Sequence, residues 1–123
     1  MQFANQEKIF KYYLLALVVP GMAFAFLVTY RYGAGLSTDG ARYLSSAENL
    51  IRGKGLSDYL GEPLTQFPPL YSVIIAGLSL LTRMDVFIVG KYLNILTFGW
   101  VIWLAGIFFR RIFPENYLYA YMG

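Results

Sequence analysis

The sequence predicts an all-α membrane protein that crosses the bilayer about three times. Hydrophobic residues make up 58% of the 123 residues and charged residues only 14%, whereas soluble domains average about 45–50% and about 25%. Aromatic residues reach 19%, which fits rings placed at both bilayer interfaces. The three predicted spans, at about residues 12–30, 67–82 and 86–109, belong to one membrane domain covering residues 1–123.

The first predicted span, residues 12–30, follows a short polar head and carries no charge. Its length is close to the roughly 20 residues that cross a hydrocarbon core of about 30 Å. The run is long for the apolar core of a signal peptide, about 7–15 residues, and no clear cleavage site follows it. A membrane anchor is therefore favoured over a signal peptide.

A polar loop, residues 31–66, follows the first span, and residues 39–52 within it have the pattern of an amphipathic surface helix. Its apolar residues recur at helical spacing: Leu44, Ala47, Leu50 and Ile51. Three polar residues can cap its first amides: Ser37, Thr38 and Asp39. Gly53 stands where a left-handed residue ends a helix, and an irregular glycine-rich stretch follows.

The second predicted span is the weakest of the three. Two prolines open it, and the apolar run 70–82 is only about 13 residues long, so it must include residues 67–69 or be partly re-entrant. The third span is longer and is interrupted only by Lys91 and Asn94. Another aromatic segment begins at Tyr117 and stops at Gly123, which predicts a fragment of a larger polytopic protein.

Charge leaves the orientation open. With three spans and a cytoplasmic N-terminus, Arg110 and Arg111 lie outside together with the cations of the loop. This arrangement opposes the usual excess of basic residues on the cytoplasmic side.

Composition also limits the chemistry. The sequence has no cysteine and no histidine, which excludes disulfides, thiol nucleophiles, Ser-His-Asp triads and His- or Cys-ligated metals. A net charge of +3, dispersed along the chain, gives no support to nucleic-acid binding. No residue is assigned as a metal ligand and no cofactor is expected with certainty. A divalent metal ion stays open, because carboxylates, water and a donor phosphate together can hold Mg²⁺ or Mn²⁺.

Several short motifs recur in order around the predicted spans. They are Asp39, Tyr43, A-E-N-L at 47–50, G-K-G at 53–55, P-P-L-Y at 68–71 and K-Y-L-N at 91–94. This order resembles the N-terminal part of the GT-C glycosyltransferases that use polyprenyl-phosphate sugars, in particular the protein O-mannosyltransferase, aminoarabinose-transferase and Rgt-like group. The resemblance extends from the first span to about Phe113. Many relatives have two adjacent acids where this chain has Asp39-Gly40, and they carry many more spans, which fits truncation.

The resemblance implies a hexosyl or pentosyl transferase in a bacterial inner membrane. Such an enzyme moves a sugar from a polyprenyl-phosphate donor to an extracytoplasmic lipid, glycan or protein. Asp39 is then the catalytic base, Arg42, Arg52 and Lys54 bind the donor phosphate, and Tyr43 and Tyr71 line the sugar or lipid pocket. The sugar, the acceptor and the oligomeric state are left open, and the fragment alone is expected to be inactive.

Each candidate residue also has a structural interpretation. The sequence pattern alone favours Asp39 as a cap of the surface helix, whereas the resemblance favours the base, and one residue can serve both roles. The basic side chains are suited to contact lipid headgroups. Tyr71 fits an interface anchor, and Glu48 fits an ion-pair partner for Arg52 one helical turn away. The alternative at the level of function is a small non-enzymatic membrane protein, such as an assembly subunit or part of a transporter.

Overall fold

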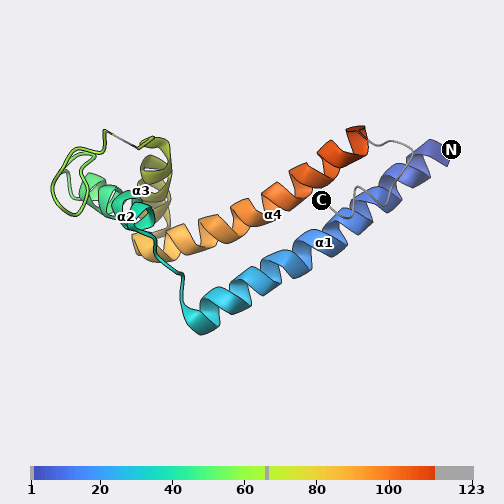
Figure 1. Ribbon diagram of the computed structural model, residues 1–123, viewed down its shortest axis with the longest axis horizontal. Helices are drawn as coiled ribbons and strands as arrows, with labels where there is room; N and C mark the ends of the chain where they lie inside the picture. Colours follow the sequence, from blue (N-terminus) through green and yellow to red (C-terminus); the bar gives the residue numbers. More distant parts are fainter. Residues whose placement is uncertain (1, 66, 113–123) are drawn as a thin grey trace. The chain divides into compact units, whose positions relative to one another are not determined.

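A computed structural model describes residues 2–65 and 67–112, with side chains from Lys8 onward. The predicted all-α class is confirmed, since the described residues form helices and no strand beyond one isolated bridge between Ser57 and Pro63. The four helices are α1 (Gln2–Tyr32), α2 (Thr38–Ile51), α3 (Leu70–Thr82) and α4 (Val86–Ile112) (Figure 1). The segment that begins at Tyr117, on which the expectation of a fragment rests, lies outside the described residues.

The chain divides into two compact units. Unit 1 comprises the described residues of Met1–Arg31 and Asn94–Gly123, that is, most of α1 and the later part of α4. Unit 2 comprises Tyr32–Leu93, that is, α2, α3, the loop between them and the first turns of α4. Each unit has its own cluster of buried apolar side chains.

Two helices are long and apolar enough to cross a membrane. The apolar part of α1, Lys8–Tyr32, has 25 residues, and α4 has 27. In contrast, α3 has 13 residues and is therefore about 20 Å long, which is short of the roughly 30 Å core. The second span thus stays a prediction. The first helix begins earlier than predicted, because its polar head contains no glycine or proline and continues the helix.

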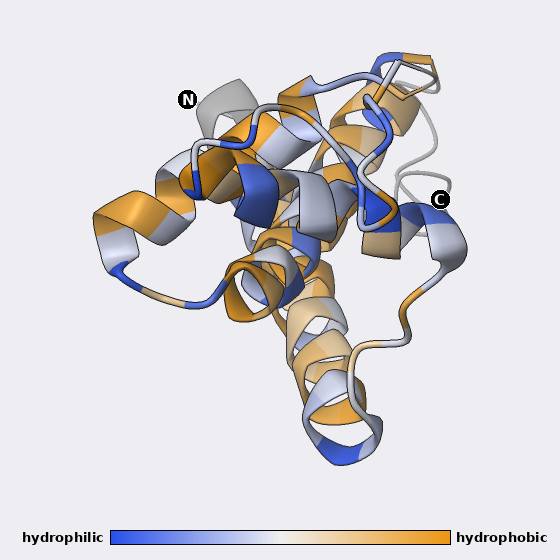
Figure 2. Cartoon of the chain, turned by 90° about the vertical axis from the view of Figure 1, so that its left-hand side faces the viewer, coloured by the Kyte–Doolittle hydropathy of each residue, from blue (hydrophilic) through white to orange (hydrophobic). Residues whose placement is uncertain are grey.

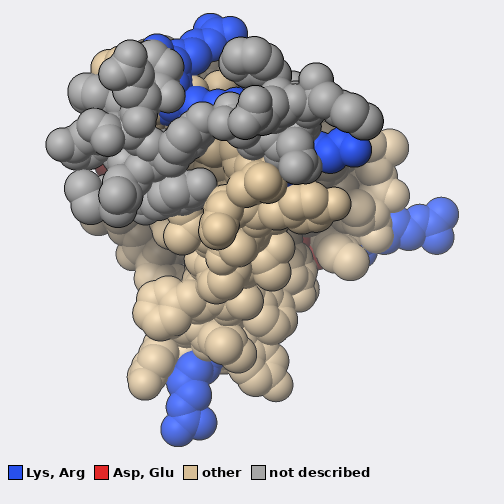
Figure 3. All heavy atoms as spheres, turned by 90° about the vertical axis from the view of Figure 1, so that its right-hand side faces the viewer, with Lys and Arg blue, Asp and Glu red and all other residues tan. Residues whose placement is uncertain are grey.

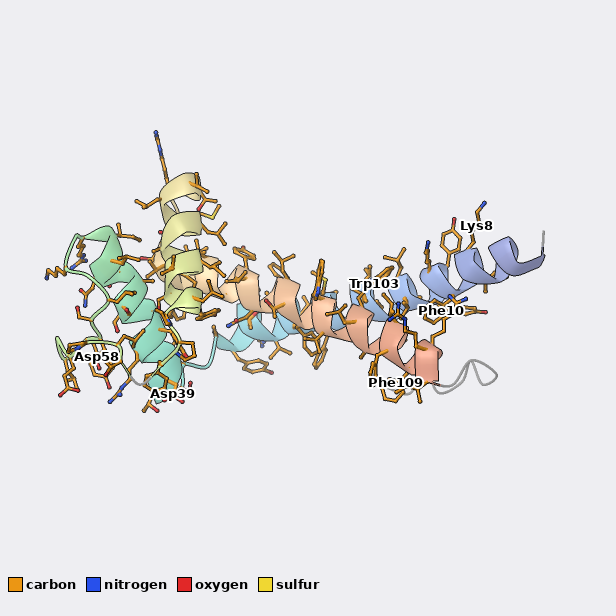
Figure 4. The ribbon with its side chains drawn as sticks, turned by 90° about the horizontal axis from the view of Figure 1, so that it is seen from above. Lys8, Phe10, Asp39, Asp58, Trp103 and Phe109 are labelled. Carbon is orange, nitrogen blue, oxygen red and sulfur yellow. The ribbon has the colours of Figure 1, made fainter. Side chains whose placement is uncertain are left out.

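In unit 1, α1 and the later part of α4 run antiparallel. A side chain at Gly106 would collide with Leu14 near the start of α1, and one at Gly99 would collide with Met22 further along it. Figure 4 shows Phe10 and Phe109 at the same end of this helix pair. Small residues are typical of contacts between membrane helices, because they let the backbones approach closely.

The outer surface of unit 1 is apolar. Large side chains on it are mostly exposed, including Phe24 at 70% and Trp100 at 66%. Figure 2 shows that hydrophobic residues predominate along the long helices. In Figure 3 uncharged side chains cover most of the visible described surface, with Lys and Arg at its margins. A surface of this kind is unfavourable in water and suits contact with lipid.

In unit 2, the apolar stripe of α2 packs against α3 and the start of α4. Its buried core consists of Ala47, Ile75, Ala76, Val86 and Val89. A Cβ at Gly90 would lie 2.9 Å from Leu44, so this glycine lets α4 approach α2. Figures 1 and 4 show α3 lying across the first turns of α4 rather than alongside them. The prediction of an amphipathic helix here is confirmed, and its apolar face is covered by protein.

Candidate functional site

The start of α2 carries Asp39, the predicted catalytic base. The cap is Ser37, whose Oγ accepts a hydrogen bond from the N–H of Gly40 at 3.0 Å. Asp39 lies in the first turn, where a carboxylate is favoured by the positive end of the helix dipole. Its side chain is exposed and has no hydrogen bond or ion pair with the described part of the chain. The carboxylate is therefore available to a ligand.

Three aromatic rings meet beside the next turn of α2. We call Tyr43, Phe67 and Tyr71 the aromatic cluster. The ring of Tyr43 packs edge-on against Phe67 at 5.5 Å and against Tyr71 at 5.4 Å between centroids. Such edge-to-face pairs stabilise by about 0.5–1.5 kcal/mol beyond their buried area. The cluster joins α2, the turn before α3 and the first turn of α3.

The cluster is fixed by a hydrogen bond between the two helices. The hydroxyl of Ser72, which is fully buried, donates to the backbone carbonyl of Tyr43 at 2.9 Å. Two prolines precede α3, and proline is tolerated in a first turn because the N–H groups there have no helical partner. The motif P-P-L-Y thereby starts α3 directly after Phe67 and presents Tyr71 to Tyr43.

Arg42 borders the aromatic cluster and is half-buried. Its guanidinium lies over the ring of Phe67, 5.6 Å from the centroid, which is a cation–π distance. Its Nε lies 3.7 Å from Oδ2 of Asp58. Of the six predicted site residues, the structure thus gathers Arg42, Tyr43 and Tyr71 at the aromatic cluster, with Asp39 one turn earlier on α2.

Asp58 is the residue that sequence reasoning missed. It is only 3% exposed, and its Oδ1 accepts hydrogen bonds from the N–H groups of Leu60 and Glu62 at 2.8 and 3.1 Å. Figure 4 shows Asp58 and Asp39 at the same end of unit 2. An acid that bonds the amide two residues ahead and is followed closely by glycine is typical of a turn, and S-D-Y-L-G at 57–61 carries this signal.

The loop from Gly53 to Leu64, which we call the Asp58 loop, is tied to α2 by Asn49. The amide of Asn49 donates to the backbone carbonyls of Ser57 and Asp58, each at 3.0 Å. Three glycines of the loop have positive φ: Gly53, Gly55 and Gly61. Gly53 ends α2 in the left-handed conformation, as predicted. The asparagine of A-E-N-L is thus a structural link between the helix and the stretch predicted to be irregular.

Arg52 and Lys54 lie at the other end of α2. The helix has 14 residues, so its ends are about 20 Å apart. Arg52 pairs with Glu48 one turn away, as predicted, and Lys54 is exposed. The structure therefore does not bring these two cations together with Asp39 and Arg42, and their positions suit contact with lipid headgroups.

The described residues contain no cluster of three acids that could hold a metal ion. The two acids have different surroundings. The carboxylate of Asp39 is exposed, whereas that of Asp58 accepts hydrogen bonds within its own loop. An exposed carboxylate can act as a general base, and a guanidinium can bind an anion.

Comparison of the chain with protein-family models, with curated proteins and with solved structures finds no match. The resemblance to GT-C enzymes therefore rests on the motifs of the sequence. The case for a function rests on the residues gathered at the start of α2.

Proposed function

We propose that this chain is the N-terminal part of a membrane glycosyltransferase of the GT-C type, which moves a sugar from a polyprenyl phosphate to an extracytoplasmic acceptor. One observation carries the proposal. The first two turns of α2 carry a carboxylate that has no partner among the described residues and a half-buried guanidinium, and the aromatic cluster packs beside them. Arg42 and Tyr43 follow Asp39 by three and four residues, so each lies on the same face of the helix as Asp39.

The proposed reaction uses Asp39 and Arg42 in different roles. The carboxylate of Asp39 takes the proton of an acceptor hydroxyl, and the oxygen attacks C1 of the sugar. The bond between C1 and the phosphate oxygen breaks, and the polyprenyl phosphate leaves with the electron pair. Arg42 stabilises the negative charge that develops on this leaving group. Tyr43 and Tyr71 offer ring faces and hydroxyls to the sugar or to the first isoprene units.

The site residues suit a position at a membrane surface. α1 ends at Tyr32, and the N-cap of α2 follows at Ser37, so the predicted base lies a few residues beyond an apolar helix. A donor held in the bilayer and an acceptor in the aqueous phase can meet there. We place this surface on the outer face of a bacterial inner membrane, in a multi-pass protein.

In this proposal, the relative direction of α1 and α4 in unit 1 indicates how many times the chain crosses the membrane. Consecutive spans alternate in direction, so the first and third of three spans would be parallel. The antiparallel contact of α1 with α4 instead supports two crossings, with α3 remaining on the side of α2. Arg110, whose guanidinium lies 4.3 Å from the ring centroid of Phe10, then shares a membrane face with Lys8 and Lys11. Basic residues at span ends are typical of the cytoplasmic face.

Cysteine labelling tests this topology, because the chain has no native cysteine. Gly35→Cys and Met84→Cys are expected to react with a membrane-impermeant maleimide on intact cells. Lys11→Cys and Arg111→Cys are expected to react only after permeabilisation. Protection of Met84→Cys together with outside labelling of Arg111→Cys would restore the three-span arrangement.

The activity is tested by sugar transfer from radiolabelled polyprenyl-phosphate hexoses and pentoses in membranes that contain the full-length gene product. Asp39→Asn keeps the shape of the side chain and removes the base, and it is expected to lower the transfer rate by at least about 100-fold. Glu62→Gln is the matched control, because it makes the same change at an exposed loop acid, and it is expected to leave transfer unchanged.

The other outcomes are equally informative. Unchanged transfer by Asp39→Asn, at normal expression, would remove Asp39 from the mechanism. Failure of the parent protein with every donor would favour the small non-enzymatic membrane protein instead.

A further inference from the structure

The guanidinium of Arg42 has protein neighbours at one ring-facing side and at its Nε, and it is otherwise partly exposed. The ring of Phe67 lies beneath it, and Oδ2 of Asp58 faces its Nε at 3.7 Å. The side chain of Arg42 is still 29% exposed. Its two terminal NH₂ groups have no hydrogen-bond partner within residues 8–65 and 67–112. Arginine has five N–H donors in a rigid fork, so most of this fork remains available to a ligand.

Asp58 is held in place without any help from Arg42. Its Oδ1 is occupied by the amides of Leu60 and Glu62, and its backbone carbonyl accepts from Asn49. The side chain of Asp58 is 4% exposed. The two carboxylate oxygens thus have different partners. Oδ1 accepts the hydrogen bonds that stabilise the loop, and Oδ2 faces Arg42.

We propose that Asp58 is a positioning residue, which holds Arg42 so that its terminal NH₂ groups bind the phosphate of the lipid donor. This inference rests on the proposed function. A guanidinium that is already held in one rotamer loses less conformational freedom when it binds. Its planar fork then meets two phosphate oxygens at once. Asp58 does not touch the donor and acts only through Arg42.

A purely structural role for the pair is the competing explanation, in which Asp58 only fastens its loop to α2. Asp58→Asn separates the two roles. The amide oxygen can still accept from Leu60 and Glu62, whereas the NH₂ group that replaces Oδ2 is a donor and cannot pair with the Nε–H of Arg42. Protection of the Leu60 and Glu62 amides against hydrogen exchange reports whether the loop is retained.

The experiment is a titration of the full-length gene product in lipid nanodiscs with farnesyl phosphate, and with farnesol as the uncharged probe. The parent is expected to bind the phosphate more tightly than the alcohol. Asp58→Asn, with its loop retained, is expected to weaken phosphate binding about tenfold and to leave farnesol binding unchanged. Equal phosphate binding by Asp58→Asn and the parent would overturn the inference alone. If the parent does not bind farnesyl phosphate more tightly than farnesol, both the proposed lipid-phosphate donor and the role of Asp58 are overturned.

A measurement on the parent needs no folded variant at Asp58. In nitrogen-15 NMR spectra, the Nε–H of Arg42 is expected to exchange with water more slowly than that of the exposed Arg31. The signal is assigned by its loss in Arg42→Lys. Addition of farnesyl phosphate is expected to shift the Nη signals of Arg42 and to leave its Nε–H protected. An Nε–H of Arg42 that exchanges as fast as that of Arg31 would overturn the positioning role.

A double-mutant cycle adds a second check. Arg42→Lys keeps the charge but lacks the fork and the Nε–H, so it is expected to weaken phosphate binding to a similar degree. If Asp58 acts through Arg42, the variant that combines both changes binds no more weakly than Arg42→Lys alone. Losses that multiply in the double variant would show that Asp58 acts independently of Arg42 and would overturn the inference.

Discussion

The two units of this chain are held together in different ways. In unit 1, two long apolar helices meet through the shapes of their side chains, with glycines opposite Leu14 and Met22. In unit 2, the Asn49 amide donates a hydrogen bond from α2 to the loop, and the Ser72 hydroxyl donates one from α3 to α2. Within the loop, the Asp58 carboxylate accepts a hydrogen bond from the N–H of Leu60. The candidate site residues lie in unit 2, where polar contacts fix the directions of the side chains.

The difference has a physical reason. Lipid is as apolar as the side chains of unit 1, so helices there associate by close packing rather than by withdrawal from water. A site that must bind charge needs donors and acceptors in defined positions, and these need partners of their own. Unit 2 supplies such partners, whereas unit 1 contains helices that are long and apolar enough to cross a membrane.

The largest effect on stability is expected from filling the glycine contact in unit 1. Gly106→Val places a branched side chain against Leu14, which is only 1% exposed and has little room to move. Overpacking of this kind typically costs about 1–3 kcal/mol. Detergent-induced unfolding can be followed by the fluorescence of Trp100 and Trp103, which both lie on α4 within unit 1.

Gly77→Val is the matched control for this change. Gly77 is also helical, but a Cβ there would meet no atom within 4 Å. Its midpoint of unfolding is expected to equal or exceed that of the parent, because glycine is a poor helix former. Equal destabilisation by the two changes would show that close contact between α1 and α4 does not hold unit 1 together.

A smaller effect is expected from two buried serines of unit 2. Ser72 and Ser46 are both 0% exposed, but Ser72 donates to Tyr43 whereas Oγ of Ser46 has no partner among the described residues. Ser72→Ala is expected to cost about 1 kcal/mol through the lost hydrogen bond. Ser46→Ala removes an unpaired polar group and is expected to be neutral or stabilising. Thermal unfolding in nanodiscs measures both, and equal losses would contradict the polar-contact account of unit 2.

Much of the fold could be predicted because its signals are local. The spacing of Leu44, Ala47 and Ile51 gave α2, and the residues after Ile51 correctly indicated its end at Gly53. The long apolar runs gave α1 and α4 as candidate spans. The choice of Ser37 as the cap could not be made in advance, because three adjacent residues were suitable.

The site was less accessible from the sequence. Tyr43 and Tyr71 were identified from motifs, and Arg42 was identified because a phosphate needs positive charge. The contacts that join them at the aromatic cluster depend on how α2 crosses α3. Asp58 was missed because its burial comes from a loop that folds back on Asn49. Contacts between residues that are distant in sequence leave little local pattern, apart from the turn signal around Asp58 itself.

The smallest effects are expected at the far end of α2. The ion pair of Arg52 with Glu48 is exposed, with side-chain exposures of 59% and 46%, and such pairs contribute only about 0.3–0.5 kcal/mol. Arg52→Gln and Lys54→Gln are therefore expected to leave stability nearly unchanged. Because both lie about 20 Å from Asp39, they are also expected to change the KM for a polyprenyl-phosphate sugar by less than about twofold.

Arg42→Gln is the matched comparison, since it makes the same change within the group around Phe67. Its KM for the lipid donor is expected to rise about tenfold or more, because a charge-assisted contact to phosphate is lost. An equal rise for Arg52→Gln or Lys54→Gln would mean that the donor phosphate lies near the C-terminal end of α2. Arg42 would then no longer be assigned to the donor phosphate, and the role of Asp58 would be limited to stabilising its loop.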